Sequence, residues 1–136
     1  MSVVMLAVAC AVPVQAGSAP SPAGARTFFV NLKDGDTVAN PVKVVFGIEG
    51  MKIAPALTHD SGTGHFHLFI DAPLTLDMAQ FAIPNDDHHL HYGKGQTEAA
   101  VSLAPGKHVL QIVLGDGNHE LHDPPVVSQP ITITVK

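Results

Sequence analysis

The chain has 136 residues, of which 46% are hydrophobic and 14% charged, a balance typical of one compact domain and not of a disordered chain. The net charge of −5 provides no basic surface, so neither nucleic acid nor anionic lipid is expected as a partner.

The start of the chain has the features of an export signal. Residues 3–16 form an apolar run that ends in Val14-Gln15-Ala16, with short residues where signal peptidase cleaves. We therefore expect a signal peptide over residues 1–16 and a periplasmic or secreted protein. The run is shorter than the roughly 20 residues that cross a bilayer, so no transmembrane span is expected. Acylation at Cys10, giving a lipid anchor, is the less favoured alternative.

The next residues separate this signal from the folded part. Residues 17–25 are small, uncharged and rich in proline, which predicts a flexible linker before a domain over residues 26–136. The only cysteine of the chain is Cys10, so the domain offers neither a disulfide nor a thiolate ligand. A metal ion bound by the domain would have to be held by nitrogen, oxygen or thioether groups.

Seven short segments of the domain have the apolar pattern of β-strands, and no longer window shows a helical repeat. They are residues 27–32, 42–49, 65–71, 90–92, 97–103, 108–115 and 131–136. Glycine and proline lie between them, and Ala-Pro-Gly-Lys at 104–107 predicts a hairpin. The pattern predicts an all-β fold, an immunoglobulin-like or cupredoxin-like antiparallel β-sandwich of about seven strands.

Histidine is the residue type that stands out, with nine in the chain. In the segment Gly-His-Phe-His-Leu-Phe-Ile-Asp at 64–71, strand alternation places His65 and His67 on one face. The same spacing recurs at His89 and His91. Each pair is close enough for its imidazoles to share one ion.

A third histidine group follows the strand that ends near residue 114. His119 and His122 lie there in a loop, and sites of β-sandwiches usually lie in such loops. Neutral imidazole is a good ligand for copper and zinc. We predict a copper site, with zinc as the alternative, whose first ligands are His65, His67, His89 and His91, completed by His119 and His122.

Other groups have supporting roles in this prediction. A carboxylate from Asp71, Asp116 or Asp123 would accept a hydrogen bond from a ligand ring. Met51 or Met78 would add a thioether if the ion is Cu(I), although gap-filling core positions are the favoured interpretation of both.

Several of the histidines also have a simpler interpretation. His59 and His108 are expected to be surface or hydrogen-bonded residues and not ligands. The paired histidines, if they bind no metal, would form an exposed polar ladder across neighbouring strands. The domain has no G-x-S-x-G, no H-E-x-x-H and no cysteine nucleophile, so an enzyme is not expected.

Four segments together resemble an exported bacterial family catalogued as domain of unknown function 4399. They are residues 30–36, 64–71, 89–98 and 115–128, and the resemblance extends over essentially the whole mature domain. It implies export and fold rather than a mechanism. A looser likeness, in composition and architecture alone, is to periplasmic copper-resistance and copper-chaperone sandwiches.

These observations predict a periplasmic protein that binds a transition-metal ion. Its role would be either to sequester the ion or to deliver it to a periplasmic metalloprotein acceptor. The alternative is a non-enzymatic cell-envelope interaction module whose histidines form a surface for a protein or a glycan. Because metal binding needs neutral imidazole, we expect it to fail as the pH falls through roughly 6 to 5.

Overall fold

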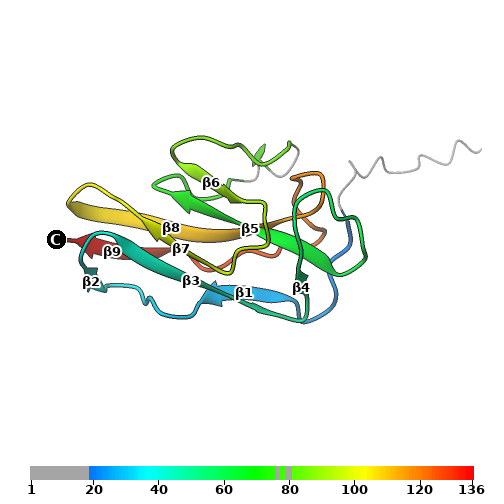
Figure 1. Cartoon of the computed structure of the whole chain (residues 1–136), viewed down its shortest axis with the longest axis horizontal. Coiled ribbons are helices and arrows are strands. Elements are labelled where there is room, and N and C mark those ends of the chain that lie inside the picture. The colour runs from blue at the N-terminus through cyan, green and yellow to red at the C-terminus, as the bar shows by residue number, and fades with distance from the viewer. Residues whose placement is uncertain (1–18, 76, 79–80) are drawn as a thin grey trace, which may run out of the picture.

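A computed structural model describes residues 19–75, 77–78 and 81–136, and within them it has nine strands and no α-helix (Figure 1). Each of the seven predicted segments overlaps a strand, and the two further strands, β2 and β4, have two residues each. Two residues are too few to produce a periodic pattern, so the sequence did not reveal them. The strands are β1 (Arg26–Phe29), β2 (Thr37–Val38), β3 (Val42–Glu49), β4 (Lys52–Ile53), β5 (Thr63–Ile70), β6 (His89–Tyr92), β7 (Glu98–Val101), β8 (Gly106–Gly115) and β9 (Ile131–Val135).

The strands form two sheets that pack face to face, which confirms the predicted β-sandwich (Figure 1). The small sheet has the order β1-β3-β7. The large sheet has the order β2-β9-β8-β5-β4, and β6 also pairs with β5. Most pairs are antiparallel, whereas the two-residue strands β2 and β4 pair in parallel with β9 and β5.

The turn at residues 104–107 does not close the predicted hairpin. Strand β7 pairs with β3 of the small sheet, whereas β8 pairs with β5 and β9 of the large sheet. The chain therefore crosses between the sheets here, and Asn40 Oδ1 accepts a hydrogen bond from the Leu103 amide at 3.0 Å beside the crossing. The hairpin prediction was wrong because glycine and proline mark a reversal without determining which sheet the next strand joins.

The main core fills the space between the two sheets. Phe66 on β5 stacks on Phe46 of β3 with ring centroids 4.8 Å apart, and Tyr92 of β6 packs against Phe46 at 5.1 Å. Phe66 and Leu68 are fully buried, as the alternation along β5 predicts. Burying each such side chain contributes about 1.5–3 kcal/mol.

The opposite face of the large sheet is also covered. Phe69 of β5 and Val113 of β8 form a second apolar cluster with Ile83 and Leu121 from the connecting segments. Strand β5 is therefore buried on both faces. Side chains that alternate away from the main core lie under a second layer of chain and not in open solvent.

The chain before β1 lies partly outside the described residues. The predicted signal peptide and Cys10 fall outside them. Of the expected linker, the described part is hydrogen-bonded to the domain, since the Ser21 amide donates to the Asp123 carbonyl at 3.0 Å and the Asp123 amide to the Ala19 carbonyl at 2.9 Å. Residues 19–21 are thus held against the loop after β8.

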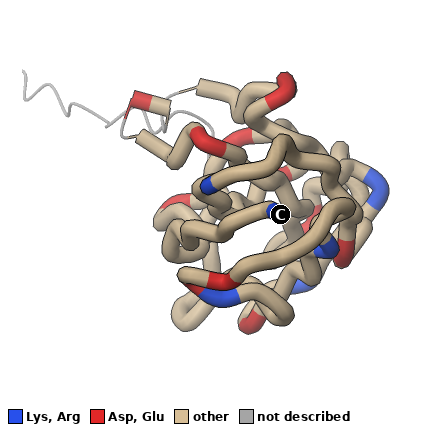
Figure 2. The backbone as a smooth tube through the Cα atoms, turned by 90° about the vertical axis from the view of Figure 1, so that its left-hand side faces the viewer, with Lys and Arg blue, Asp and Glu red and all other residues tan. Residues whose placement is uncertain are grey.

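Two further features concern the predicted absence of a basic surface and of a transmembrane span. Lys and Arg positions are scattered around the molecule in Figure 2 and do not gather on one side. Among the described residues, no helix is long and apolar enough to cross a lipid bilayer.

His108 at the start of β8 connects two turns. Its Nδ1 lies 2.8 Å from Asp71 Oδ2 and its Nε2 lies 2.7 Å from the Ala104 carbonyl oxygen. Both oxygens accept, so both ring nitrogens must donate, and only the protonated imidazolium has two N–H groups. The hydrogen bond to Asp71 is the main cause that raises the pKa of His108 above its ordinary value. His108 is confirmed as a hydrogen-bonded residue, and the Asp71 carboxylate faces it instead of a candidate ligand.

We predict a pH-dependent stability effect at His108. Because the pKa of His108 is raised, its contribution to the free energy of unfolding is present below about pH 6.5. This contribution is lost as the pH rises through the pKa that His108 has in the folded protein. His108→Ala should lower the free energy of unfolding by about 1 kcal/mol at pH 6 and by less at pH 9, measured by urea denaturation. The exposed His59→Ala is the control. An equal loss at both pH values would contradict the imidazolium assignment.

Candidate metal centre

Four histidine rings gather on the outer face of the large sheet, and we call them the histidine cluster. His65 and His67 come from β5, and His91 of β6 pairs in register with His67. His119 comes from the loop after β8. The six distances between ring centroids run from 4.7 to 6.0 Å, so the rings surround one common space.

Three of the four rings direct a nitrogen toward one point. One nitrogen each from His65, His91 and His119 lies within 4.8 Å of the other two, and His91 Nε2 is 2.9 Å from His119 Nε2. Ligand nitrogens around a tetrahedral ion, each about 2.0–2.1 Å from the metal, lie about 3.4 Å apart. These three residues form the candidate metal triad.

The cluster contains buried nitrogen atoms whose bonding is incomplete. His65 and His67 are each 1% exposed. Among the described residues, His65 Nε2 and His67 Nδ1 have no hydrogen-bond partner. Leaving such a group unpaired costs about 1–3 kcal/mol. A metal ion that accepts the lone pair of His65 removes that cost, so the donor set fits an ion.

The cluster also favours neutral rings. Burial, followed by the charges of His119 and His91, lowers the pKa of His65 to about 4. Burial, followed by the charge of His65, lowers the pKa of His67 to about 2. Burial, followed by the charge of His119, lowers the pKa of His91 as well. Because protons compete weakly for the nitrogens of His65 and His91, a bound ion should persist to a lower pH than the range of 6 to 5 expected from ordinary histidines.

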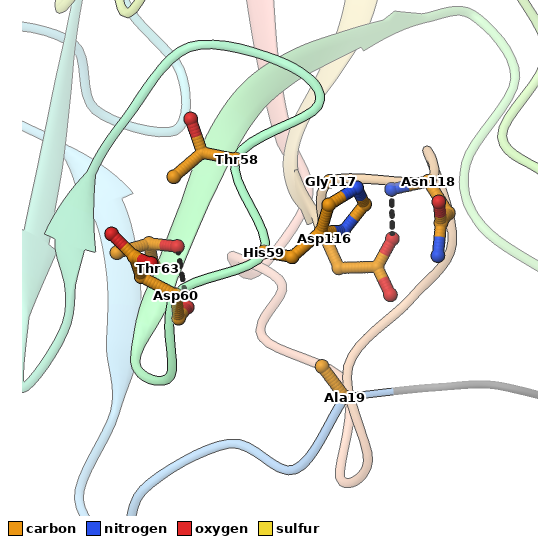
Figure 3. Close-up of a pocket in the computed structure, with 8 residues that line it drawn as sticks. All are labelled: Ala19, Thr58, His59, Asp60, Thr63, Asp116, Gly117 and Asn118. Carbon is orange, nitrogen blue, oxygen red and sulfur yellow. Dashed lines mark hydrogen bonds between the residues drawn. The ribbon is translucent and has the colours of Figure 1, made fainter.

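The loop that brings in His119 is folded by Asp116. This buried carboxylate accepts from the Asn118 amide at 2.8 Å, as the dashed line in Figure 3 shows, and from the Glu120 amide at 3.0 Å. His119 lies between them with a φ of +61°, a conformation that few side chains adopt readily. Asp116 was expected to orient a ligand ring directly. The structure shows it bonded to the loop backbone that positions His119.

Two glycines leave room for the rings. A Cβ atom at Gly115 would lie 2.5 Å from His67 Cε1, and one at Gly93 would collide with the His91 ring. The rings therefore pack directly against backbone. Sequence reasoning missed both positions, although each glycine lies within two residues of a β-strand end next to a histidine segment.

Two predicted ligands lie apart from the triad. His89 Nδ1 donates to Asp86 Oδ1 at 2.7 Å, and the His89 ring meets the Phe69 ring edge to face. The register places it opposite Phe69 and not opposite a histidine. His122 is buried, and its Nε2 donates to the Thr63 carbonyl at 3.1 Å. A ligand role for His89 or His122 stays a prediction that this geometry does not favour.

The remaining candidates lie elsewhere. His59 is exposed and lines a separate pocket beside Gly117 (Figure 3). Met51 packs against the main core and Met78 against the second apolar cluster, as gap-filling residues do. The cluster itself opens on a pocket lined by His67, Ala82, Ile83, Asn85, His91, Asn118 and His119.

Fold and site together define a β-sandwich with a candidate metal centre on the outer face of its larger sheet. The chain belongs to the family described as Domain of unknown function (DUF4399), whose model matches residues 44–136 and thereby every residue of the histidine cluster. The family description names no activity. The searches of curated proteins and of solved structures gave no match.

We predict that metal affinity depends on Asp116 through the loop. Asp116→Ala removes the acceptor for two amides, so His119 should lose its position and the affinity for Zn(II) should fall on the order of 10-fold or more. Asp116→Asn keeps an acceptor oxygen and should retain most of the affinity. Competition with a chromophoric chelator measures both. Equal loss in the two variants would show that the charge of Asp116, and not its hydrogen bonds, is what matters.

Proposed function

We propose that this protein binds one transition-metal ion, copper or alternatively zinc, through His65, His91 and His119. Its role would be to sequester the ion or deliver it to an acceptor protein outside the cytoplasm. The observation that carries the proposal is the convergence of three imidazole nitrogens within 4.8 Å of one another.

The donor atoms support the choice of metal. Imidazole nitrogen suits copper and zinc, whereas magnesium and calcium prefer oxygen ligands. For one set of nitrogen ligands, Cu(II) generally binds more tightly than Zn(II), which favours copper. Met51 and Met78 pack in apolar clusters, so the site offers no support for thioether-bound Cu(I).

The position of the triad supports exchange of the ion. His65 lies under the covering chain with 1% exposure, while His91 and His119 are only partly buried and line a pocket. An acceptor can approach an ion from that side. The apolar run with a signal-peptidase motif at residues 1–16 supports export, and delivery at the cell envelope follows from export and exchange together.

The burial of His65 and His67 argues against the alternative function, the interaction module. An interaction module would need its histidines on a surface that a protein or glycan can touch. His65 and His67 are each 1% exposed, so two of the paired histidines present almost no area to such a partner. The metal proposal accounts for the burial of His65 and for its unpartnered Nε2 together.

Metal titration of the purified chain, produced without a histidine tag, tests the proposal. We expect one site each for Cu(II) and Zn(II) by calorimetry and chelator competition. His91→Gln should lower the affinity on the order of 100-fold because it removes one of three ligands. The matched controls are His59→Ala and His88→Ala, which change histidines outside the cluster and should leave the affinity unchanged.

Circular dichroism of each variant separates a lost ligand from a lost fold. Folded His91→Gln protein that still binds one ion with wild-type affinity would overturn the triad. Several weak sites, insensitive to every cluster substitution, would overturn metal binding as the function and favour the interaction module.

A further inference from the structure

We infer that an ion bound by the triad keeps a fourth coordination position open to the pocket, where it binds a small monodentate anion from solution. This inference rests on the proposed function and adds a ligand class to it. It follows from the position of the pocket, the orientation of His67 and the charge of the pocket wall.

The pocket lies on one side of the triad. His91 and His119 line it, whereas His65 does not and is 1% exposed. An ion between the three nitrogens therefore has His65 on its inner side and the pocket on its outer side. Three imidazole ligands with one open position are the arrangement of catalytic and exchangeable zinc sites, whereas closed structural sites have four protein ligands.

His67 is the residue that would otherwise close the site. Its ring centroid lies 6.0 Å from that of His119, the longest distance in the cluster. Its Cε1 edge packs toward Gly115, where a Cβ atom would come within 2.5 Å, and its nitrogens are outside the converging group. The His67 ring forms part of the pocket wall.

The pocket wall favours an anion. Among the residues that the structure describes, the pocket lining includes no Asp, Glu, Lys or Arg, so a dipositive ion would bring the main formal charge that these residues leave facing a ligand. Asn85 and Asn118 line the pocket, and the side chain of each has an amide NH₂ group, which is a donor for an anion. Ile83 and Ala82 supply apolar surface to the pocket.

Cobalt substitution with azide as the probe tests the inference. Co(II) bound by nitrogen ligands absorbs visible light, and this absorption changes when its coordination changes. We expect a saturable one-to-one change on addition of azide to the Co(II)-loaded chain. Asn118→Ala and Asn85→Ala should each weaken azide binding about 2- to 10-fold, since each removes one hydrogen-bond donor. His59→Ala, outside this pocket, should bind azide as the wild type does.

The outcomes separate this inference from the function on which it rests. A Co(II) spectrum that ignores azide in the wild type but responds to it in His67→Ala would show that His67 fills the fourth position. That result overturns the open position and leaves metal binding intact. A chain that gives no cobalt spectrum at all overturns both.

Discussion

Strand β5 is buried on both faces, and its pairing with β6 and β8 determines where His65, His67 and His91 of the cluster lie. One face carries Phe66 and Leu68 into the main core, and the other carries His65 and His67 toward the covering chain. Pairing with β6 places His91 across from His67, and pairing with β8 places Gly115 across from His65. A slip of one residue would exchange the two faces and put imidazoles into the main core, so burial of the phenylalanine and leucine fixes the register.

Burying the histidine rings lowers the stability of the fold, and the same burial keeps their nitrogens neutral. Buried imidazoles with unpartnered nitrogens are less stable than the apolar side chains around them, and their depressed pKa values express the same cost for the charged form. The stacked aromatic rings and alternating aliphatic residues of the main core offset it. The result is a set of neutral nitrogen donors held in place before any ion arrives, which lowers the reorganisation that binding requires.

Much of this could be predicted from the sequence because strand alternation has a period of two. That rule placed His65 with His67 and predicted the sandwich. The expectation that His108 is a surface or hydrogen-bonded residue came instead from the usual behaviour of a lone histidine. Strand alternation could not separate His91 from His89, since both lie on one face and only the register with Phe69 distinguishes them. Nor could it separate His119 from His122, because a positive φ and the hydrogen bonds of Asp116 set the loop. The roles of Gly93 and Gly115 depend on contacts between segments distant in the chain, which a single sequence does not show.

X-ray absorption spectroscopy of the ion-loaded chain tests the central claim most directly, because it reports the atoms around the metal. The account predicts three imidazole nitrogens at about 2.0–2.1 Å from Zn(II), with the multiple-scattering pattern of histidine rings and no sulfur. A first shell of oxygen atoms alone, or one with a single imidazole, would contradict the claim that the histidine cluster is a metal centre.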